Sequence, residues 1–230
     1  MNTRDSILGR IREALRAGSV GHAAESGAEL GAGSVGIRRF LPKVPDDFPG
    51  QLALFAELSA NLKTEFLPCA DEAAASAQLQ VLAAREQWES VACPANSEMQ
   101  NLLTALTIPK LEVSRSTAMT DLGKTSAGIT GCDALVAQTG SVLLTAASGG
   151  GRALSVLPPH HVVIASASQL VPDLPAAFEL LHRKYGPNFP SFMTFITGPS
   201  RTGDIERILV LGAHGPRKLS VIMVGQTAVS

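Results

Sequence analysis

An alternation of helix-type and strand-type segments between residues 51 and 113 constrains the fold of this chain most. Helical patterns near 51–63, 71–88 and 95–106 are each followed by a short apolar run, at 64–68, 89–93 and 110–113. Asp71 stands where its carboxylate can cap the second helix. Because successive strands joined by helices run in the same direction, this order predicts an α/β fold with parallel strands and helices on both faces.

Beyond Thr120 the pattern is rich in strands. Thr139-Gly140 lies between two apolar runs and is a turn sequence that predicts a β-hairpin. A hairpin added to parallel strands makes a mixed sheet flanked by helices. The predicted strands of this half are 134–137, 141–145, 162–165, 191–196, 208–211 and 219–224.

The N-terminal region differs from the rest. Residues 1–16 predict an amphipathic helix, and residues 17–50, which begin with a Gly-, Ala- and Ser-rich stretch, predict a flexible linker. The helix can dock on its own domain, on a twin subunit or on another partner, and its sequence does not choose among them. Residues 51–230 are long enough for one α/β domain. The apolar stripe of the helix consists of Ile7, Leu8, Ile11, Ala14 and Leu15.

Charge and hydropathy exclude several classes of protein. Nineteen Lys and Arg against twenty Asp and Glu give a net charge of -1, which favours neither nucleic acid nor an anionic membrane. No apolar run reaches the roughly 18 residues of a spanning helix. Met1–Arg16 lacks the apolar core of a secretory signal and contains acidic residues, so the expected location is the cytoplasm.

The cysteines argue against a metal centre in this chain. Cys69, Cys93 and Cys132 are far apart and lack the paired spacings of zinc or iron–sulfur ligands. We therefore expect buried thiols, no metal site and no cofactor. The Gly-rich fingerprint of dinucleotide binding is also missing after the early strands.

A glycine-rich turn after the predicted strand 191–196 is the first candidate site. Backbone N–H groups, the hydroxyls of Ser200 and Thr202 and the Arg201 guanidinium can together bind a carboxylate or a phosphate, with Asp204 nearby. The alternative is an ordinary loop in which Asp204 caps a helical turn and pairs with Arg201. The segment reads Gly198-Pro199-Ser200-Arg201-Thr202-Gly203-Asp204-Ile205-Glu206.

The segment Gly212-Ala213-His214-Gly215-Pro216-Arg217 supplies the candidate acid or base. Imidazole titrates near neutral pH, so His214 can move a proton if a substrate lies within hydrogen-bond reach. Gly215 and Arg217 join the candidate anion-binding residues. The alternative is a turn in which the histidine and the arginine only satisfy backbone carbonyls.

Two further segments carry candidates. Thr139, Gly140 and Ser141 form the hairpin bend, where hydroxyls and close backbone approach suit a ligand, although simple turn chemistry explains them equally. Arg152 follows three glycines that suggest a mobile flap closing on an anion. We expect the 139–141 bend, the turn after residue 196 and the 214–217 corner to converge around one electropositive hollow. His160 and His161 should point to opposite faces of their strand.

Together, five ordered segments resemble the LUD-domain family, and within it the lactate-utilisation protein C type. The resemblance covers residues 51–224, and the N-terminal helix also fits it. The segments are Gly-Ile-Thr-Gly-Cys-Asp at 128–133, Gln-Thr-Gly-Ser at 138–141, Leu-Pro-Pro-His-His at 157–161, the 198–206 turn and His-Gly-Pro-Arg at 214–217.

This resemblance implies a fold similar to NagB, RpiA and the CoA transferases. It also implies a subunit without cofactor in a system that oxidises L-lactate to pyruvate independently of NAD, beside partner proteins that carry iron–sulfur clusters. Gln138 stands where many relatives have Glu, and an amide cannot act as a nucleophile or a base, so binding is favoured over acyl transfer. The matching positions are Thr139, Gly140, Ser141, Pro158, Ser200, Arg201, Thr202, Asp204, His214, Gly215 and Arg217.

Three hypotheses remain at this point. The leading one is a subunit of a lactate-oxidising iron–sulfur complex, in which Arg201, Ser200 and Thr202 hold a carboxylate and His214 assists proton movement. The second is a free-standing enzyme that acts on a phosphorylated metabolite, a folate or an acyl-CoA. The third is a scaffold that assembles other subunits without catalysis of its own.

Overall fold

The computed structural model describes residues 41–95, 101–114, 116–202, 210–212 and 214–225. The chain divides into two units, residues 1–41 and 42–230, and all described helices and strands lie in the second. The predicted N-terminal helix and most of the predicted linker lie outside the described residues.

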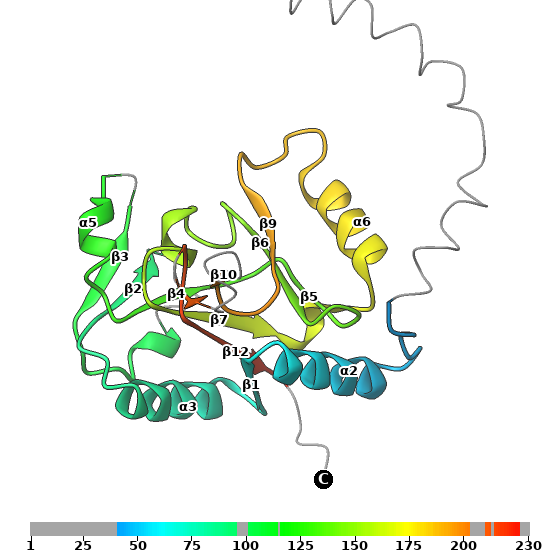
Figure 1. The fold of residues 1–230 in the computed structure, drawn as a ribbon, viewed down its shortest axis with the longest axis horizontal. Helices are drawn as coiled ribbons and strands as arrows, with labels where there is room; N and C mark the ends of the chain where they lie inside the picture. Colours follow the sequence, from blue (N-terminus) through cyan, green and yellow to red (C-terminus); the bar gives the residue numbers. More distant parts are fainter. Residues whose placement is uncertain (1–40, 96–100, 115, 203–209, 213, 226–230) are drawn as a thin grey trace, which may run out of the picture. The chain divides into compact units, whose positions relative to one another are not determined.

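A six-stranded parallel sheet forms the centre of the second unit (Figure 1). Its order is β1-β12-β7-β4-β2-β3, and every neighbouring pair is parallel. The alternating helix and strand pattern of the first half of the chain predicted that these strands are parallel, but not their order. The strands are β1 (Thr64–Cys69), β2 (Val91–Pro94), β3 (Lys110–Val113), β4 (Ala127–Thr130), β7 (His160–Ser166) and β12 (Lys218–Val224).

A second sheet of four strands has the order β8-β5-β6-β9 and is mixed. β5 (Ala134–Val136) and β6 (Ser141–Thr145) form the predicted hairpin, and Gly140 in its bend has a φ of 61°, which glycine adopts without strain. β9 (Met193–Ile196) is antiparallel to β6, and β8 (Leu170–Val171) is parallel to β5. A short antiparallel pair joins β10 (Arg201–Thr202) to β11 (Val210–Leu211).

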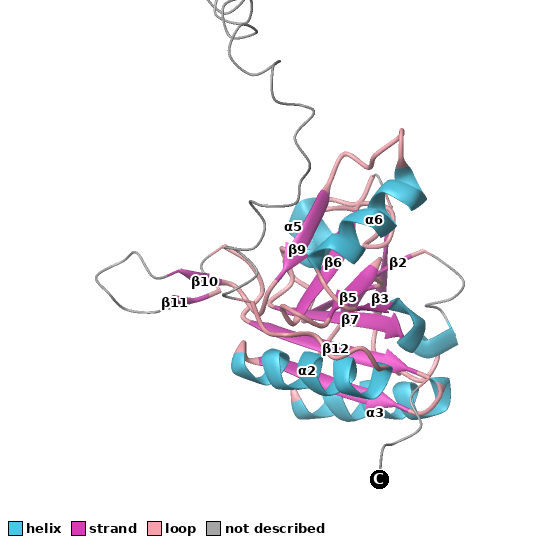
Figure 2. Cartoon of the chain, turned by 90° about the vertical axis from the view of Figure 1, so that its right-hand side faces the viewer, coloured by secondary structure: helices cyan, strands magenta, loops and turns pink. Residues whose placement is uncertain are grey.

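The helices cover the two sheets. Asp47, Asp71 and Asp173 cap the N-termini of α2 (Phe48–Asn61), α3 (Glu72–Arg85) and α6 (Leu174–Tyr185), and the predicted capping by Asp71 is confirmed. α3 packs on one face of the parallel sheet, whereas α2 and the second sheet pack on the other. α6 covers the outer face of the second sheet, so α3 and α6 lie on opposite sides of the two sheets (Figure 2). Shorter helices are α5 (Met119–Leu122), η3 (Ala153–Ser155) and η4 (Ala167–Gln169).

Strand β12 shows how the core is divided. Leu219, Val221 and Met223 are buried in the cluster with Phe55 of α2, whereas Ile222 is buried in the cluster with α3. Alternate side chains of a strand point to opposite faces, so one sequence run supplies both layers. Because both faces are covered, the strand is apolar almost throughout, as is usual in buried parallel sheets.

The structure confirms the α/β class and differs from the predicted elements in several places. Helix α6 occupies residues 174–185, where no helix was predicted, although Asp173 and Pro175 are standard signals of a helix start. β4 was not among the predicted strands. Of the predicted helix 95–106, residues 101–103 are helical, and residues 96–100 lie outside the described part.

Candidate functional site

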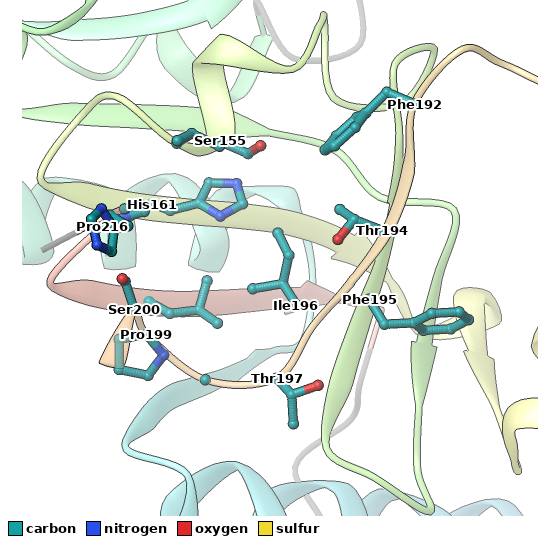
Figure 3. Close-up of a pocket in the computed structure, with 15 residues that line it drawn as sticks. Ser155, His161, Phe192, Thr194, Phe195, Ile196, Thr197, Pro199, Ser200 and Pro216 are labelled. Atoms are coloured by element: carbon teal, nitrogen blue, oxygen red, sulfur yellow. The ribbon is translucent and has the colours of Figure 1, made fainter. Parts of the chain in front are cut away.

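A cavity of about 330 Å³ lies where β9, the start of β7 and the turn before β12 meet (Figure 3). We call it the His161 cavity. Figure 3 shows the His161 ring between Ser155 on one side and Ser200 and Pro216 on the other. The cavity is lined by Ser155, Val156, His161, Phe192, Thr194, Phe195, Ile196, Thr197, Gly198, Pro199, Ser200, His214, Gly215, Pro216 and Leu219.

His161 is buried, and a hydrogen bond to Thr130 holds its ring in place. Its Nε2 lies 2.8 Å from Oγ1 of Thr130, a buried residue of the neighbouring strand β4. Burial, with a smaller effect of His160, lowers the pKa of His161 to about 3. The ring is therefore neutral at physiological pH, and it can offer a ligand a hydrogen bond but no charge.

Positive charge lies next to residues of the cavity wall, although neither Arg152 nor Arg201 lines the cavity itself. Arg152 lies over the Phe192 ring, 5.0 Å from its centroid. A Cβ built on Gly198 would lie 3.5 Å from Arg201 Nη2, so the Arg201 guanidinium lies beside the Gly198 backbone. None of the described residues that line the cavity is acidic. Hydroxyl donors inside the cavity, with arginines beside its lining residues Phe192 and Gly198, are the groups that a small anion would need.

Hydrogen bonds join the two predicted glycine-rich segments. Ser200 N donates to Pro216 O over 2.9 Å, and Gly212 N donates to Ser200 O over 3.0 Å. Ser200, His214 and Gly215 consequently line the same cavity, as the sequence predicted for these two segments. His214 is exposed, so its imidazole is open to both the cavity and solvent.

The hairpin bend lies behind the cavity wall. Thr139, Gly140 and Ser141 do not line the cavity, but Ser141 Oγ lies 2.8 Å from Oγ1 of Thr197, which does. A Cβ on Gly140 would lie 3.0 Å from Leu58 Cβ, so this glycine allows close packing against α2. The hairpin bend therefore supports the cavity wall at Thr197. Of the three segments expected to converge, the turn after residue 196 and the 214–217 corner line the cavity, and the 139–141 bend packs behind it.

The other predicted residues lie elsewhere. Arg217 does not line the His161 cavity. Thr202 is described only as a backbone position of β10, and Asp204 lies outside the described residues. In the glycine turn before Arg152, a Cβ on Gly150 would lie 2.8 Å from Pro94 Cβ, so tight packing explains this glycine. Gln138 Nε2 donates to Pro42 O over 3.2 Å.

Several lining residues were not among the predicted site residues. His161, Ser155, Thr194 and Thr197 are the polar ones. The Leu-Pro-Pro-His-His segment was noted in the sequence, and its two histidines point to opposite faces of β7 as expected: His161 contacts Thr130, whereas His160 contacts Ser220. Sequence spacing alone could not decide which of the two faces the cavity.

A larger crevice of about 680 Å³ opens at the carboxyl ends of β4, β7 and β12. This is the usual ligand position in open parallel sheets. Its lysine, Lys184, pairs with the buried carboxylate of Asp133 over 2.7 Å, and Ser148 donates to the same carboxylate over 2.6 Å. Gln169 Nε2 donates to Cys132 O over 2.6 Å. These contacts already engage much of the polar lining, so the His161 cavity is the stronger candidate.

Asp133 shows how firmly this polar cluster is held. Burial raises the pKa of Asp133, but hydrogen bonds from Lys184, Ser148 and Tyr185 outweigh burial and lower it overall. Tyr185 OH donates to Asp133 Oδ1 over 2.6 Å. The carboxylate therefore ties α6 to the start of β5.

The cysteines are buried thiols, as expected. Burial raises the pKa of Cys93 to about 11 and raises the pKa of Cys132 as well. Within the described residues, no group of three or more His, Cys, Asp or Glu side chains is placed to hold a metal ion. No helix of the described part is both long and apolar enough to cross a membrane.

Fold and site together define an α/β protein with a parallel sheet, a second mixed sheet and a cavity lined by residues of both. The chain belongs to the LUD-domain family, which it matches over residues 52–224.

Curated relatives named lactate utilization protein C match part of the chain. The protein from Geobacillus sp. (strain WCH70) is 41% identical over 99 residues, which are 42% of this chain and 41% of the relative. The protein from Bacillus subtilis (strain 168) is 37% identical over 99 residues, again 42% and 41% of the two chains. The chain thus matches about two fifths of the length of these relatives.

A solved structure shares the fold. A DUF162 family protein from Deinococcus radiodurans superimposes with a TM-score of 0.60 over 79% of this chain and 100% of that chain, at 23% sequence identity. This likeness supports the α/β architecture.

Proposed function

We propose that this chain is a cytoplasmic subunit of a lactate-utilisation system and that it binds a small carboxylate, L-lactate or pyruvate, in the His161 cavity. The observation that carries the proposal is the similarity, at 37% and 41% identity, to proteins named lactate utilization protein C. Membership of the LUD-domain family over residues 52–224 supports it.

The lining of the cavity supports a carboxylate ligand. Ser200 and Thr194 can donate hydrogen bonds to carboxylate oxygens, and the Arg201 guanidinium beside Gly198 supplies the opposite charge. The volume of about 330 Å³ lies near the lower end for small-molecule sites, which favours a metabolite over a large cofactor. Predominantly apolar walls lower the local dielectric and strengthen these contacts.

The histidines have different parts in this proposal. Neutral His161, held by Thr130, positions the ligand through a hydrogen bond. Exposed His214 lies at the cavity and can pass a proton between ligand and solvent. Redox chemistry is assigned to partner proteins with iron–sulfur clusters, because Cys69, Cys93 and Cys132 lack the paired spacings of cluster ligands. No cofactor is assigned to this chain.

Calorimetric titration of the full-length protein with L-lactate and with pyruvate tests the ligand. Loss of a hydrogen bond or an ion pair to a charged group costs about 1.5–3 kcal/mol, so Ser200→Ala and Arg201→Gln should each weaken binding roughly 10- to 100-fold. Arg183→Ala removes an exposed charge from α6 and serves as the matched control. Unchanged affinity in both cavity variants would defeat the proposed carboxylate site.

Growth on lactate tests the proposed role in lactate utilisation. Deletion of the gene should abolish growth on lactate, and affinity purification of the full chain should recover an iron–sulfur partner. Complementation with Arg201→Gln should restore growth poorly, whereas Arg183→Ala should restore it fully. Normal growth of the deletion strain on lactate would overturn the role in lactate utilisation.

A further inference from the structure

A second, smaller cavity of about 210 Å³ adjoins the His161 cavity and shares Pro199 and Leu219 with it. We call it the Arg217 cavity. It lies at the amino ends of β1, β7 and β12. Its lining residues are Lys63, Glu65, His160, Pro199, Arg217, Lys218, Leu219 and Ser220.

The lining carries more positive than negative charge. Glu65 is already neutralised by Arg85, whose Nη1 and Nη2 donate over 2.7 and 2.6 Å. Lys218 pairs with Glu86. Lys63 and Arg217 make no ion pair within the part of the chain that the structure describes. Two positive charges are therefore left without a partner there.

A hydrogen-bonded chain of side chains forms one wall. Ser220 Oγ donates to Glu65 Oε2 over 3.1 Å, so its single proton is used. The contact of 2.9 Å between His160 Nε2 and Ser220 Oγ then requires that Nε2 carry the hydrogen. This fixes the tautomer of His160 and leaves its Nδ1 as an acceptor.

That acceptor has no partner among the described residues. His160 is 4% exposed, and its Nδ1 is buried without a hydrogen bond. Buried polar groups are nearly always satisfied in native proteins, so an exception calls for an explanation such as a missing ligand or water. An unpaired acceptor calls for a hydrogen-bond donor, which a water molecule or the P–OH of a monoprotonated phosphate supplies.

Lys63 is held in place by the same turn that separates the cavities. It is a non-glycine residue with a φ of 66°, a conformation that persists only where the surroundings fix it. A Cβ built on Gly198 would lie 2.8 Å from Leu62 O, so the 198–199 turn packs directly against the residue before Lys63.

We propose that the Arg217 cavity is a second anion site, distinct from the carboxylate site, and that it binds a phosphate group between Lys63 and Arg217. A phosphomonoester carries a charge of about −1.5 to −2 at pH 7, which matches two unpaired cations, whereas a monocarboxylate matches only one. Phosphate oxygens also accept hydrogen bonds at more positions than a carboxylate, which suits a site whose free donors are a lysine and an arginine.

The test is calorimetric titration of the full-length protein with inorganic phosphate, with glycerol 3-phosphate and with acetate. The variants are Arg217→Gln, which keeps the length of the side chain, and Lys63→Gly, which retains the backbone conformation at a positive φ. Arg183→Ala is the control. We expect phosphate binding that each variant weakens about tenfold or more, acetate binding that is much weaker, and an unchanged control.

The outcomes separate the two proposals. Tighter binding of glycerol 3-phosphate than of inorganic phosphate identifies an esterified phosphate as the ligand, and the reverse order identifies the free ion; either supports the site. Phosphate that is not bound at millimolar concentration, or is bound equally well by both variants, overturns it. L-lactate titrations of Arg217→Gln should match the unsubstituted protein, so the carboxylate site can fail or survive independently.

Discussion

Lowering the pH from 8 to 5 should destabilise this protein by about 4 kcal/mol through the two buried histidines of β7. Burial lowers the pKa of His160 to about 4 and the pKa of His161 to about 3, from 6.5 in an exposed histidine. Acidic neighbours of His160, chiefly Glu86, act in the opposite direction but are outweighed.

The protein loses stability on acidification because the unfolded chain binds more protons than the folded one. Below pH 6.5 the unfolded chain takes up protons that the folded chain excludes, so the stabilisation is complete above pH 6.5 and is lost as the pH falls towards 4 and 3. At pH 5 the unfolded histidine is about 1.5 units below its pKa, and one unit is worth about 1.36 kcal/mol. Each histidine therefore contributes a loss of about 2 kcal/mol.

Urea unfolding followed by far-UV circular dichroism, at several pH values between 8 and 5, measures the effect. His161→Gln should remove about half of the loss between these limits, and Gln can keep a hydrogen bond to Thr130. Arg183→Ala, at an exposed arginine of α6 that stays charged throughout this pH range, is the control and should leave the pH dependence unchanged. If the unfolding free energy of His161→Gln falls with pH as steeply as that of the unsubstituted protein, the reasoning about burial is wrong.

Three other perturbations have defined outcomes. Asp133→Asn removes the charge that Lys184, Ser148 and Tyr185 bind, and should lower the free energy of unfolding by about 2–3 kcal/mol in urea titrations at pH 7. The difference between variant and unsubstituted protein should disappear at a pH low enough to protonate the Asp133 carboxyl. Gly128→Ala places a Cβ 2.4 Å from Leu154 O and should cost about 1–3 kcal/mol, measured as a lower Tm, whereas Gly123→Ala, with 3.6 Å to the nearest atom, should cost much less. The buried cysteines should react with Ellman's reagent at pH 8 only after denaturation, and fast reaction of the native protein would contradict the burial of Cys93 and Cys132.

Local patterns predicted most of the sheet. The hairpin at Thr139-Gly140, the cap at Asp71 and strand β6 at Ser141–Thr145 follow from turn, capping and β-branching preferences that act over a few residues. Helix α6 was not predicted, because the segments around it are rich in β-branched residues and its helix-start signals, Asp173 and Pro175, stand alone among them. Its apolar positions, Ala177 and Leu181, have helical spacing and pack on the second sheet.

The candidate site was predictable only in part, because local sequence does not show which segments lie close together in the folded chain. The pairing of the 198–202 and 212–217 segments depends on a backbone hydrogen bond between Ser200 and Pro216. His161 enters the cavity because β7 lies between β4 and β12 in the sheet, and strand order cannot be read from the residues themselves. The same reason explains why Arg217 lines a separate cavity.

The placement of His160 and His161 on one strand has a practical consequence. The two faces of strand β7 line different cavities, with His161 in one and His160 in the other. A shift of the strand by one residue would exchange the two imidazoles and disrupt both cavities at once. Insertions or deletions before Val162 are therefore far more damaging than substitutions there. Either cavity can therefore be engineered only by substitutions that keep the length of the 157–161 segment unchanged.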